Sequence, residues 1–212
     1  LYSIYYMKNM KYYIVYIFIA LIICKVLYNY NFDNNIVLKT STKDGKEYFV
    51  LNYYNSLGAA NQLSDINSRI KKLFDECSKD DSEDNSESNQ RMIKKYNFDK
   101  LSELSPTSKY TAYSLNKGEK IKLCLRDNDN KLINNLNVSM FVMCHELAHL
   151  KTKEEQHPPI FWENMIYLLK KASDCGVYKP ADYKKKPVYY GHNIINNNPM
   201  FKEEEENYPY IN

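Results

Sequence analysis

The hydrophobic positions of this 212-residue chain repeat with two different periods. Residues 59–74, 138–150 and 161–172 carry apolar side chains at spacings of three and four, which is typical of helices that bury one face. The second of these segments is apolar at most positions, so we expect its helix to be buried. Asn135 or Asn137 is suited to cap the start of that helix.

Alternating apolar and polar positions predict short strands elsewhere in the chain. Residues 36–38 and 48–51 flank a predicted turn. A β-hairpin is expected over 110–126, with its turn at Asn116-Lys117-Gly118, where glycine allows a positive φ. The returning strand of this hairpin, 120–126, would offer a sheet edge to an extended peptide.

Three further segments are assigned by composition and spacing. Apolar residues between 92 and 104 predict a second helical segment, which ends before Pro106. Residues 78–90 are acidic and polar without an apolar side chain, and we expect them to form a disordered acidic loop. Residues 201–212 are expected to form an acidic C-terminal tail.

An apolar and aromatic run near the N-terminus predicts a membrane anchor over residues 12–28. A membrane span needs about 20 mostly apolar residues, and Lys25 can direct its charge to the interface. Because Lys8 and Lys11 precede the run, a secretory signal is the alternative. No small-residue cleavage site follows, which favours an uncleaved, single-pass anchor. Lysines flank both sides, so the orientation in the membrane stays open.

Charge and cysteine content restrict the class of protein. The chain has 29 basic and 26 acidic residues, a net charge of +3 that is too even to indicate nucleic-acid binding by itself. Its five cysteines are scattered, and none are in C-x-x-C spacing. A disulfide framework is therefore not expected, and a reducing compartment fits better.

The sequence His145-Glu146-Leu147-Ala148-His149 lies within the apolar helix expected over 138–150. A spacing of four places His145 and His149 on one face, one turn apart, where both imidazoles can reach a single ion. Glu146 projects nearby and is free to act on a metal-bound water. Burying these polar groups in apolar surroundings would be costly unless they bound something.

A third metal ligand is expected at His157, because three of the four histidines lie between residues 145 and 157. The prolines that follow His157 suit the start of the next helix, which would hold this histidine in place. If His157 does not bind, the fallback ligands are three nearby carboxylates: Glu154, Glu155 and Glu163. Phe161 and Trp162 are assigned to core packing from their place on the helix.

His145–His149, then His157, then Phe161-Trp162, resembles the H-E-L-x-H…H-x-x-x-F-W pattern of WLM-type and SprT-like zincins. Residues 113–120 and 176–191 look like segments of an uncharacterised family of membrane-anchored H-E-x-x-H proteins from giant DNA viruses. The resemblance covers roughly 56–200 and the N-terminal apolar run. Metzincins have a Gly between the second and third histidines, whereas residues 150–156 contain none.

The resemblance implies an α+β, zincin-like fold. A buried H-E-x-x-H helix would pack on a small, mostly antiparallel sheet, with additional helices and an N-terminal transmembrane helix. We expect this domain to cover residues 30–200, after a tail at 1–11 whose first residues, 1–6, are interpreted as a gene-model extension. The expected location is a virion or host-cell membrane, with the domain on the reducing side.

The expected activity is hydrolysis of peptide bonds in a protein or peptide substrate, with Zn²⁺ as the cofactor. Zinc would polarise the scissile carbonyl, and Glu146 would take a proton from the zinc-bound water. Tyr190 and His192 are candidates to stabilise the oxyanion. A nucleic-acid partner enters only by analogy with relatives that act on DNA-crosslinked proteins. The alternative is a membrane-anchored, non-catalytic zinc-binding viral structural or assembly protein.

Overall fold

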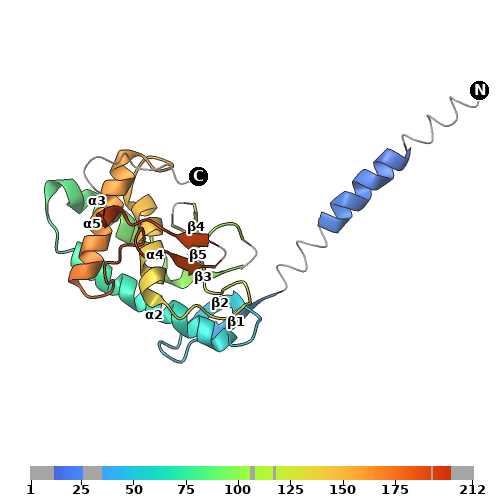
Figure 1. The fold of residues 1–212 in the computed structure, drawn as a ribbon, viewed down its shortest axis with the longest axis horizontal. Helices are drawn as coiled ribbons and strands as arrows, with labels where there is room; N and C mark the ends of the chain where they lie inside the picture. The colour runs from blue at the N-terminus through green and yellow to red at the C-terminus, as the bar shows by residue number, and fades with distance from the viewer. Residues whose placement is uncertain (1–11, 26–34, 106–107, 117, 192, 202–212) are drawn as a thin grey trace, which may run out of the picture. The chain divides into compact units, whose positions relative to one another are not determined.

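A computed structural model describes residues 12–25, 35–105, 108–116, 118–191 and 193–201. The chain divides into two units, Leu1–Val37 and Leu38–Asn212. In the described part, five α-helices and small sheets make up a mixed α+β protein, which confirms the expected class (Figure 1).

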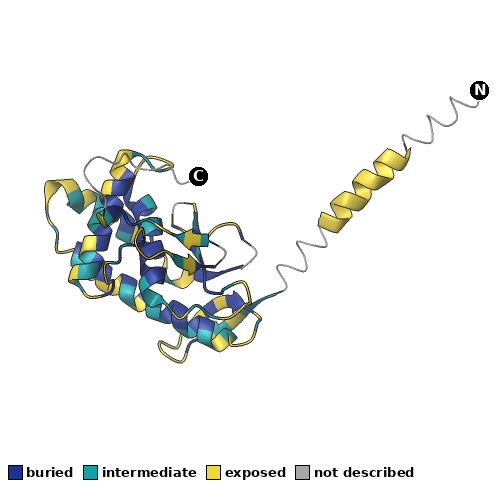
Figure 2. Ribbon diagram, in the orientation of Figure 1, coloured by how far each residue is buried: buried dark blue, intermediate teal, exposed yellow. Residues whose placement is uncertain are grey.

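The prediction of a transmembrane anchor at 12–28 is wrong by the criterion of helix length. Residues 12–25 form a helix whose side chains are exposed (Figure 2). A membrane-crossing helix needs about 20 mostly apolar residues, and no helix among the described residues is both long and apolar enough. The single-pass localisation inferred from this anchor is therefore withdrawn. Residues 26–28 lie outside the described residues.

The second unit begins with the predicted strand pair and amphipathic helix. Strands β1 (Ile36–Thr40) and β2 (Glu47–Leu51) form a two-stranded sheet. They lead to α2 (Ser56–Cys77), which buries the apolar face expected from its spacing. Asn55 caps α2, since its side chain accepts a hydrogen bond from Gly58 N at 3.1 Å.

Helix α2 is also joined to distant parts of the chain by two side-chain hydrogen bonds. Gln62 Nε2 donates to the carbonyl of Ile133 at 2.8 Å. Arg69 Nη1 donates to the carbonyl of Val177 at 2.7 Å. These bonds tie α2 to the segments that precede and follow the two central helices.

The segment expected to be a disordered acidic loop is helical from Glu83 onward. Helix α3 (Glu83–Lys95) has acidic residues in its first turn and Lys94 and Lys95 in its last, an arrangement that complements the helix dipole. Its buried residues are Asn89 and Met92. The polar composition did not predict this helix. It packs on α4 (Leu136–Lys151) with one buried apolar residue, Met92, while polar side chains provide the remaining contacts.

The second half of the predicted 92–104 helix is instead a strand. After the short helix η1 (Phe98–Lys100), β3 (Leu101–Leu104) is buried along its whole length and pairs in parallel with β5 (Lys120–Cys124). Strand β4 (Ala112–Leu115) pairs with β5 in the antiparallel sense and completes the predicted hairpin. A short apolar run does not distinguish a buried strand from a helix.

The order of this sheet is β3-β5-β4, with one parallel and one antiparallel pair. Strand β5 is therefore central, and the prediction that residues 120–126 present a free sheet edge is wrong. Both sides of β5 are already hydrogen-bonded to neighbouring strands. Strand β4 is at the edge of the sheet instead.

The two helices that the sequence predicted after residue 135 are both present, and α4 lies inside the unit (Figure 1). Helix α4 (Leu136–Lys151) begins after Asn135, whose side chain accepts from Val138 N at 3.2 Å. Helix α5 (Pro159–Asp174) starts on its proline and packs against α4. Helices α2 and α3 and strand β4 also contact α4, which buries most of its length.

A buried lysine at the end of α4 forms hydrogen bonds with α3. Lys151 is 0% exposed, and its Nζ donates to Asn85 Oδ1 at 3.1 Å, Ser88 Oγ at 2.5 Å and Asn89 Oδ1 at 2.9 Å. The same Nζ lies 4.5 Å from the centre of the Tyr167 ring on α5. Burial lowers the pKa of Lys151 to about 8. Uncharged oxygens and an aromatic face therefore replace the water that this ammonium group would otherwise bind.

The chain ends, within the described residues, in a hairpin and a short turn. Strands β6 (Val188–Tyr190) and β7 (Asn193–Ile195) are antiparallel, and the short helix η2 (Pro199–Phe201) follows. Asn198 anchors this region by donating to Tyr178 OH and to the carbonyl of Ala181, both at 2.9 Å.

An ion pair inside the protein holds β3 to the segments around it. Arg126 Nε and Glu103 Oε1 are 2.7 Å apart, and both side chains are at most 1% exposed. Glu103 also accepts a hydrogen bond from Leu51 N. Arg126 donates to the carbonyls of Tyr54 and Asn130.

We expect Glu103→Gln to lower the free energy of unfolding by about 3 kcal/mol or more, because Arg126 would keep a buried, unbalanced charge. Denaturant unfolding measures this change. The control is Asp99→Asn, which removes the exposed ion pair with Lys46 and should cost less than about 1 kcal/mol. Equal losses in the two variants would contradict the role of the buried pair.

Candidate metal and catalytic site

Helix α4 provides two of the three clustered histidines. His145 and His149 lie one turn apart, as the sequence predicted, and their ring centroids are 5.0 Å apart. Both lie in the last part of the helix, where the neighbouring Leu147, Ala148 and Leu150 are buried. The helix therefore holds the two imidazoles on one side while its apolar residues fix its position in the core.

The connection between α4 and α5 returns His157 to the same place. One ligand atom from each of His145, His149 and His157 lies within 4.8 Å of the other two. The Nε2 atoms of His145 and His157 are 3.2 Å apart. Two nitrogens bound tetrahedrally to zinc at 2.0–2.1 Å would be separated by about 3.3 Å. The donor type and spacing therefore fit a zinc ion.

The chain turns toward His157 without the glycine found in metzincins. Gln156 has a φ of 64°, which is the left-handed conformation that glycine adopts most easily. A non-glycine residue pays a steric cost there, so the surrounding structure has to fix the turn. Pro158 follows His157 directly and caps α5 in an extended conformation.

Phe161 supports all three histidines from one side. The centroid of its ring lies 4.9 Å from that of His145, and 4.5 Å from those of His149 and His157. Phe161 is 0% exposed. The sequence assigned this residue to the core, and the structure adds that its ring contacts the three imidazoles as well as Trp162.

Glu146 shares a cleft with two of the histidines. This cleft, of about 370 Å³, is lined by His145, Glu146 and His157 together with residues of α5, the start of β4 and the β7 region. Glu146 is itself buried, at 6% exposure. Its side chain therefore lies in the same cleft as His145 and His157.

Burial sets the protonation of these groups. Desolvation, with smaller repulsion from neighbouring imidazoles, lowers the pKa of His145 to about 3 and that of His149 to about 4. Desolvation also lowers the pKa of His157 and raises that of Glu146 to about 7. Near neutral pH the three imidazoles are neutral, so their lone pairs are available to a metal ion.

The remaining candidate residues are not brought to the cluster. Tyr190 is fully buried, and its hydroxyl lies 3.0 Å from Ser139 Oγ rather than in the cleft. Its position fits a structural role better than the oxyanion role suggested by the sequence. His192 lies outside the described residues. The fallback ligands are exposed and are not members of the cluster: Glu154, Glu155 and Glu163.

Sequence reasoning missed the residues that complete the cleft. Trp162 follows Phe161 on α5, lines the cleft, and its ring centroid lies 5.7 Å from that of His157. Lys109 and Tyr110 come from the segment before β4, and Asn193 and Ile194 from β7. The adjacent aromatic residues Phe161 and Trp162 could have indicated this. Consecutive residues of a helix point about 100° apart, so the two side chains rarely pack against the same neighbours.

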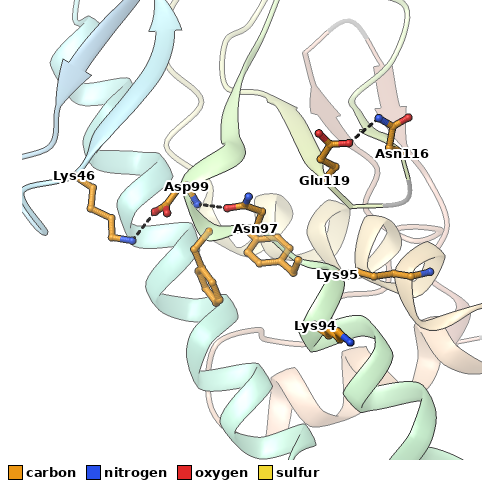
Figure 3. A pocket seen from close by; sticks show the side chains of 9 residues that line it. Lys46, Lys94, Lys95, Asn97, Asp99, Asn116 and Glu119 are labelled. Atoms are coloured by element: carbon orange, nitrogen blue, oxygen red, sulfur yellow. Dashed lines mark hydrogen bonds and ion pairs between the residues drawn. The ribbon is translucent and has the colours of Figure 1, made fainter.

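A larger hollow elsewhere in the second unit does not share this chemistry. It measures about 620 Å³ and is lined by charged and amide side chains together with Tyr96 and Phe98, without histidine or cysteine (Figure 3). Lys46 pairs with Asp99 at 2.8 Å, and Asn116 donates to Glu119 at 2.7 Å. These four polar side chains thus bind one another in pairs, and we assign no ligand to this hollow.

The pKa shifts predict how metal-free protein responds to acid. Between about pH 5 and 6 the unfolded chain protonates its histidines, whose usual pKa is 6.5, whereas folded His145 and His149 stay neutral. Folded Glu146 is protonated in this window and ionises on unfolding. Unfolding then takes up roughly one net proton, so the free energy of unfolding should rise with pH by about 1.4 kcal/mol per unit.

The variant Glu146→Gln removes the proton that Glu146 releases on unfolding, which opposes the proton uptake by the histidines. Without the carboxyl, unfolding takes up about two protons in the same window, and the rise with pH should become about twice as steep. Denaturant unfolding of chelator-treated protein at several pH values measures both slopes. Identical slopes for the two proteins would show that Glu146 is ionised in the folded state.

Comparison with known proteins agrees with this geometry. Residues 85–209 match the model of the WLM domain, a metallopeptidase-like family. The chain is also similar to "Uncharacterized protein R325" of Acanthamoeba polyphaga mimivirus, at 35% identity over 150 residues, covering 68% of this chain and 75% of that protein. No solved structure gives a significant match. The chain belongs to the WLM domain family, and it has a relative in a giant virus.

Proposed function

We propose that this protein is a zinc-dependent peptidase. The observation that carries the proposal is the convergence of three neutral imidazoles within 4.8 Å of one another, with the buried carboxyl of Glu146 in the same cleft. Family membership supports it, since the WLM domain is metallopeptidase-like. The fold we propose for residues 38–201 is zincin-like.

His145, His149 and His157 would hold the zinc ion. Catalytic zinc sites generally have three protein ligands and leave a fourth position for water or substrate, whereas structural sites have four ligands and are rich in cysteine. Among the described residues, the cluster contains three histidines and no cysteine. A bound zinc ion would supply Lewis acidity and lower the pKa of water to about 7.

Glu146 would act as the general base. Its side chain lines the cleft, and its pKa of about 7 in the metal-free protein is close to that of an effective proton acceptor at neutral pH. It would take the proton of the attacking water and transfer it to the leaving amine. Phe161 would restrict the imidazoles to one arrangement and so act as a positioning residue.

The substrate chain would pair with β4. This strand is at the edge of the sheet, and residues 109–112, which lead into it, line the cleft. Thr111 lies opposite Cys124 and accepts a hydrogen bond from its amide. Along an antiparallel pair, successive residues direct their backbone N–H and C=O groups alternately toward and away from the partner strand. The backbone groups of Ala112 and Ser114 therefore face away from β5, where a substrate strand would bind them.

Metal-free protein should take up one zinc ion per chain, and His157→Asn should weaken zinc binding at least tenfold. Competition with a chromogenic chelator measures the affinity. Glu163→Gln is the matched control, since it removes a fallback ligand that is exposed on α5. If Glu163→Gln lost zinc while His157→Asn kept it, the third ligand would be the carboxylate.

Glu146→Gln should keep its zinc and lose peptide hydrolysis by a factor of about 10² to 10⁴, since it removes the general base. A mixed peptide library read by mass spectrometry measures turnover, again with Glu163→Gln as the control. Undiminished turnover in Glu146→Gln would refute the mechanism. A zinc-loaded wild-type protein that cuts no peptide would favour the alternative of a non-catalytic zinc-binding viral structural or assembly protein.

A further inference from the structure

The apolar part of the cleft lies one helical turn from the proposed catalytic groups. Phe141 and Val142 line it from α4, four residues before His145 and Glu146. Residues four apart on a helix lie one above the other, separated by about one turn of 5.4 Å. A side chain seated against Phe141 and Val142 would therefore belong to a residue next to the bond that Glu146 acts on.

The opposite side of this pocket comes from α5 and the C-terminal segment. Trp162 and Met165 are three residues apart on α5 and line the cleft, at 4% and 1% exposure. Ile195 and Pro199 close it from the β7 side. These lining side chains are largely apolar, and the space that they surround can hold a large side chain.

Two contacts hold the walls of the pocket together. The ring of Phe141 packs edge-on against Tyr183, with centroids 5.0 Å apart. Asn193 Nδ2 donates to the carbonyl of Lys109 at 3.3 Å, which joins β7 to the segment before β4. Preformed apolar pockets with a few polar groups at one end are the usual form of ligand sites.

Charge also restricts the occupant. Among the described residues that line the cleft, Lys109 and Glu146 are the only acidic or basic side chains besides the neutral histidines. Glu146 is committed to the proposed reaction, and Lys109 is exposed, with its Nζ 5.0 Å from the centre of the Tyr110 ring. A charged side chain seated among Phe141, Val142, Trp162 and Met165 would lose its hydration without gaining a partner of opposite charge from these four residues.

We infer that this pocket selects peptide substrates with a large apolar residue, such as leucine or methionine, beside the scissile bond. The inference rests on the proposed peptidase function, because it identifies the cleft as the substrate site. The selecting residues are Phe141, Val142, Trp162, Met165, Ile195 and Pro199.

Trp162 provides a reading that does not require hydrolysis, because it is the only tryptophan in the chain and it lines the pocket. The experiment uses full-length Glu146→Gln protein and blocked pentapeptides, Ala-Ala-X-Ala-Ala, in which X is leucine, methionine, glycine, aspartate or lysine. We expect saturable changes in Trp162 fluorescence, with leucine and methionine peptides binding about 10- to 100-fold more tightly than the others. Calorimetry provides an independent measure of binding.

A neighbouring pair of residues on α5 gives a matched test of the pocket. Met165→Ala should enlarge it and shift the preference from leucine toward phenylalanine at X, which is measured by adding a phenylalanine peptide to the set. Ile166→Ala, the next residue, does not line the pocket and should leave the preference unchanged. Val142→Phe should fill the pocket and weaken the leucine peptide to the affinity of the glycine peptide, and thermal unfolding checks that each variant is folded.

The outcomes separate the two proposals. Preference for apolar residues that moves with Met165→Ala and Val142→Phe supports the pocket, even if the wild-type protein hydrolyses nothing. Equal binding of all peptides, preference for a charged residue, or no binding by either method overturns it. Hydrolysis of peptides by wild-type protein without any preference at X would overturn the pocket and leave the peptidase function standing.

Discussion

The structure depends on one physical constraint, which is that three half-buried imidazoles and the buried carboxyl of Glu146 lie together against an apolar core. Desolvation disfavours the charged form of each group, so the histidines are held neutral and Glu146 is pushed toward protonation. The lone pairs of neutral imidazoles are available to a cation. Packing holds the three rings close together, because helices and a strand contact α4 and the ring of Phe161 lies against the histidines.

Helix α5 contacts both the histidine cluster and the cleft, through the adjacent residues Phe161 and Trp162. Phe161 faces the three histidines and fixes them, while Trp162 and Met165 face the cleft. The start of this helix also determines where His157 lies, because Pro158 follows that histidine directly. A shift of α5 along its axis would therefore change the candidate metal ligands and the cleft together.

The parts of the molecule that the sequence predicted well have long periodic patterns and clear end signals. Helix α4, with Asn135 as its cap, is an example. Because this helix forms, the four-residue spacing of His145 and His149 places both side chains on one face. Strand β3 was missed because Leu101–Leu104 is too short to distinguish the two periods. Helix α3 was missed because it docks largely through polar side chains, and their partners, such as Lys151, are distant in sequence. The membrane anchor was overpredicted from composition without a helix of sufficient length.

The hydrogen bonds of α2 have a consequence for how the family segment relates to the folded unit. The shared WLM segment begins at residue 85, inside α3, whereas the compact unit begins at Leu38. Helix α2 lies in the earlier part, yet it packs on α4 and α5 and binds the carbonyls of Ile133 and Val177. The segment that matches the WLM domain and the compact unit are thus not the same. A protein that shares only the matched segment needs, from its own sequence, another cover for these faces of α4 and α5.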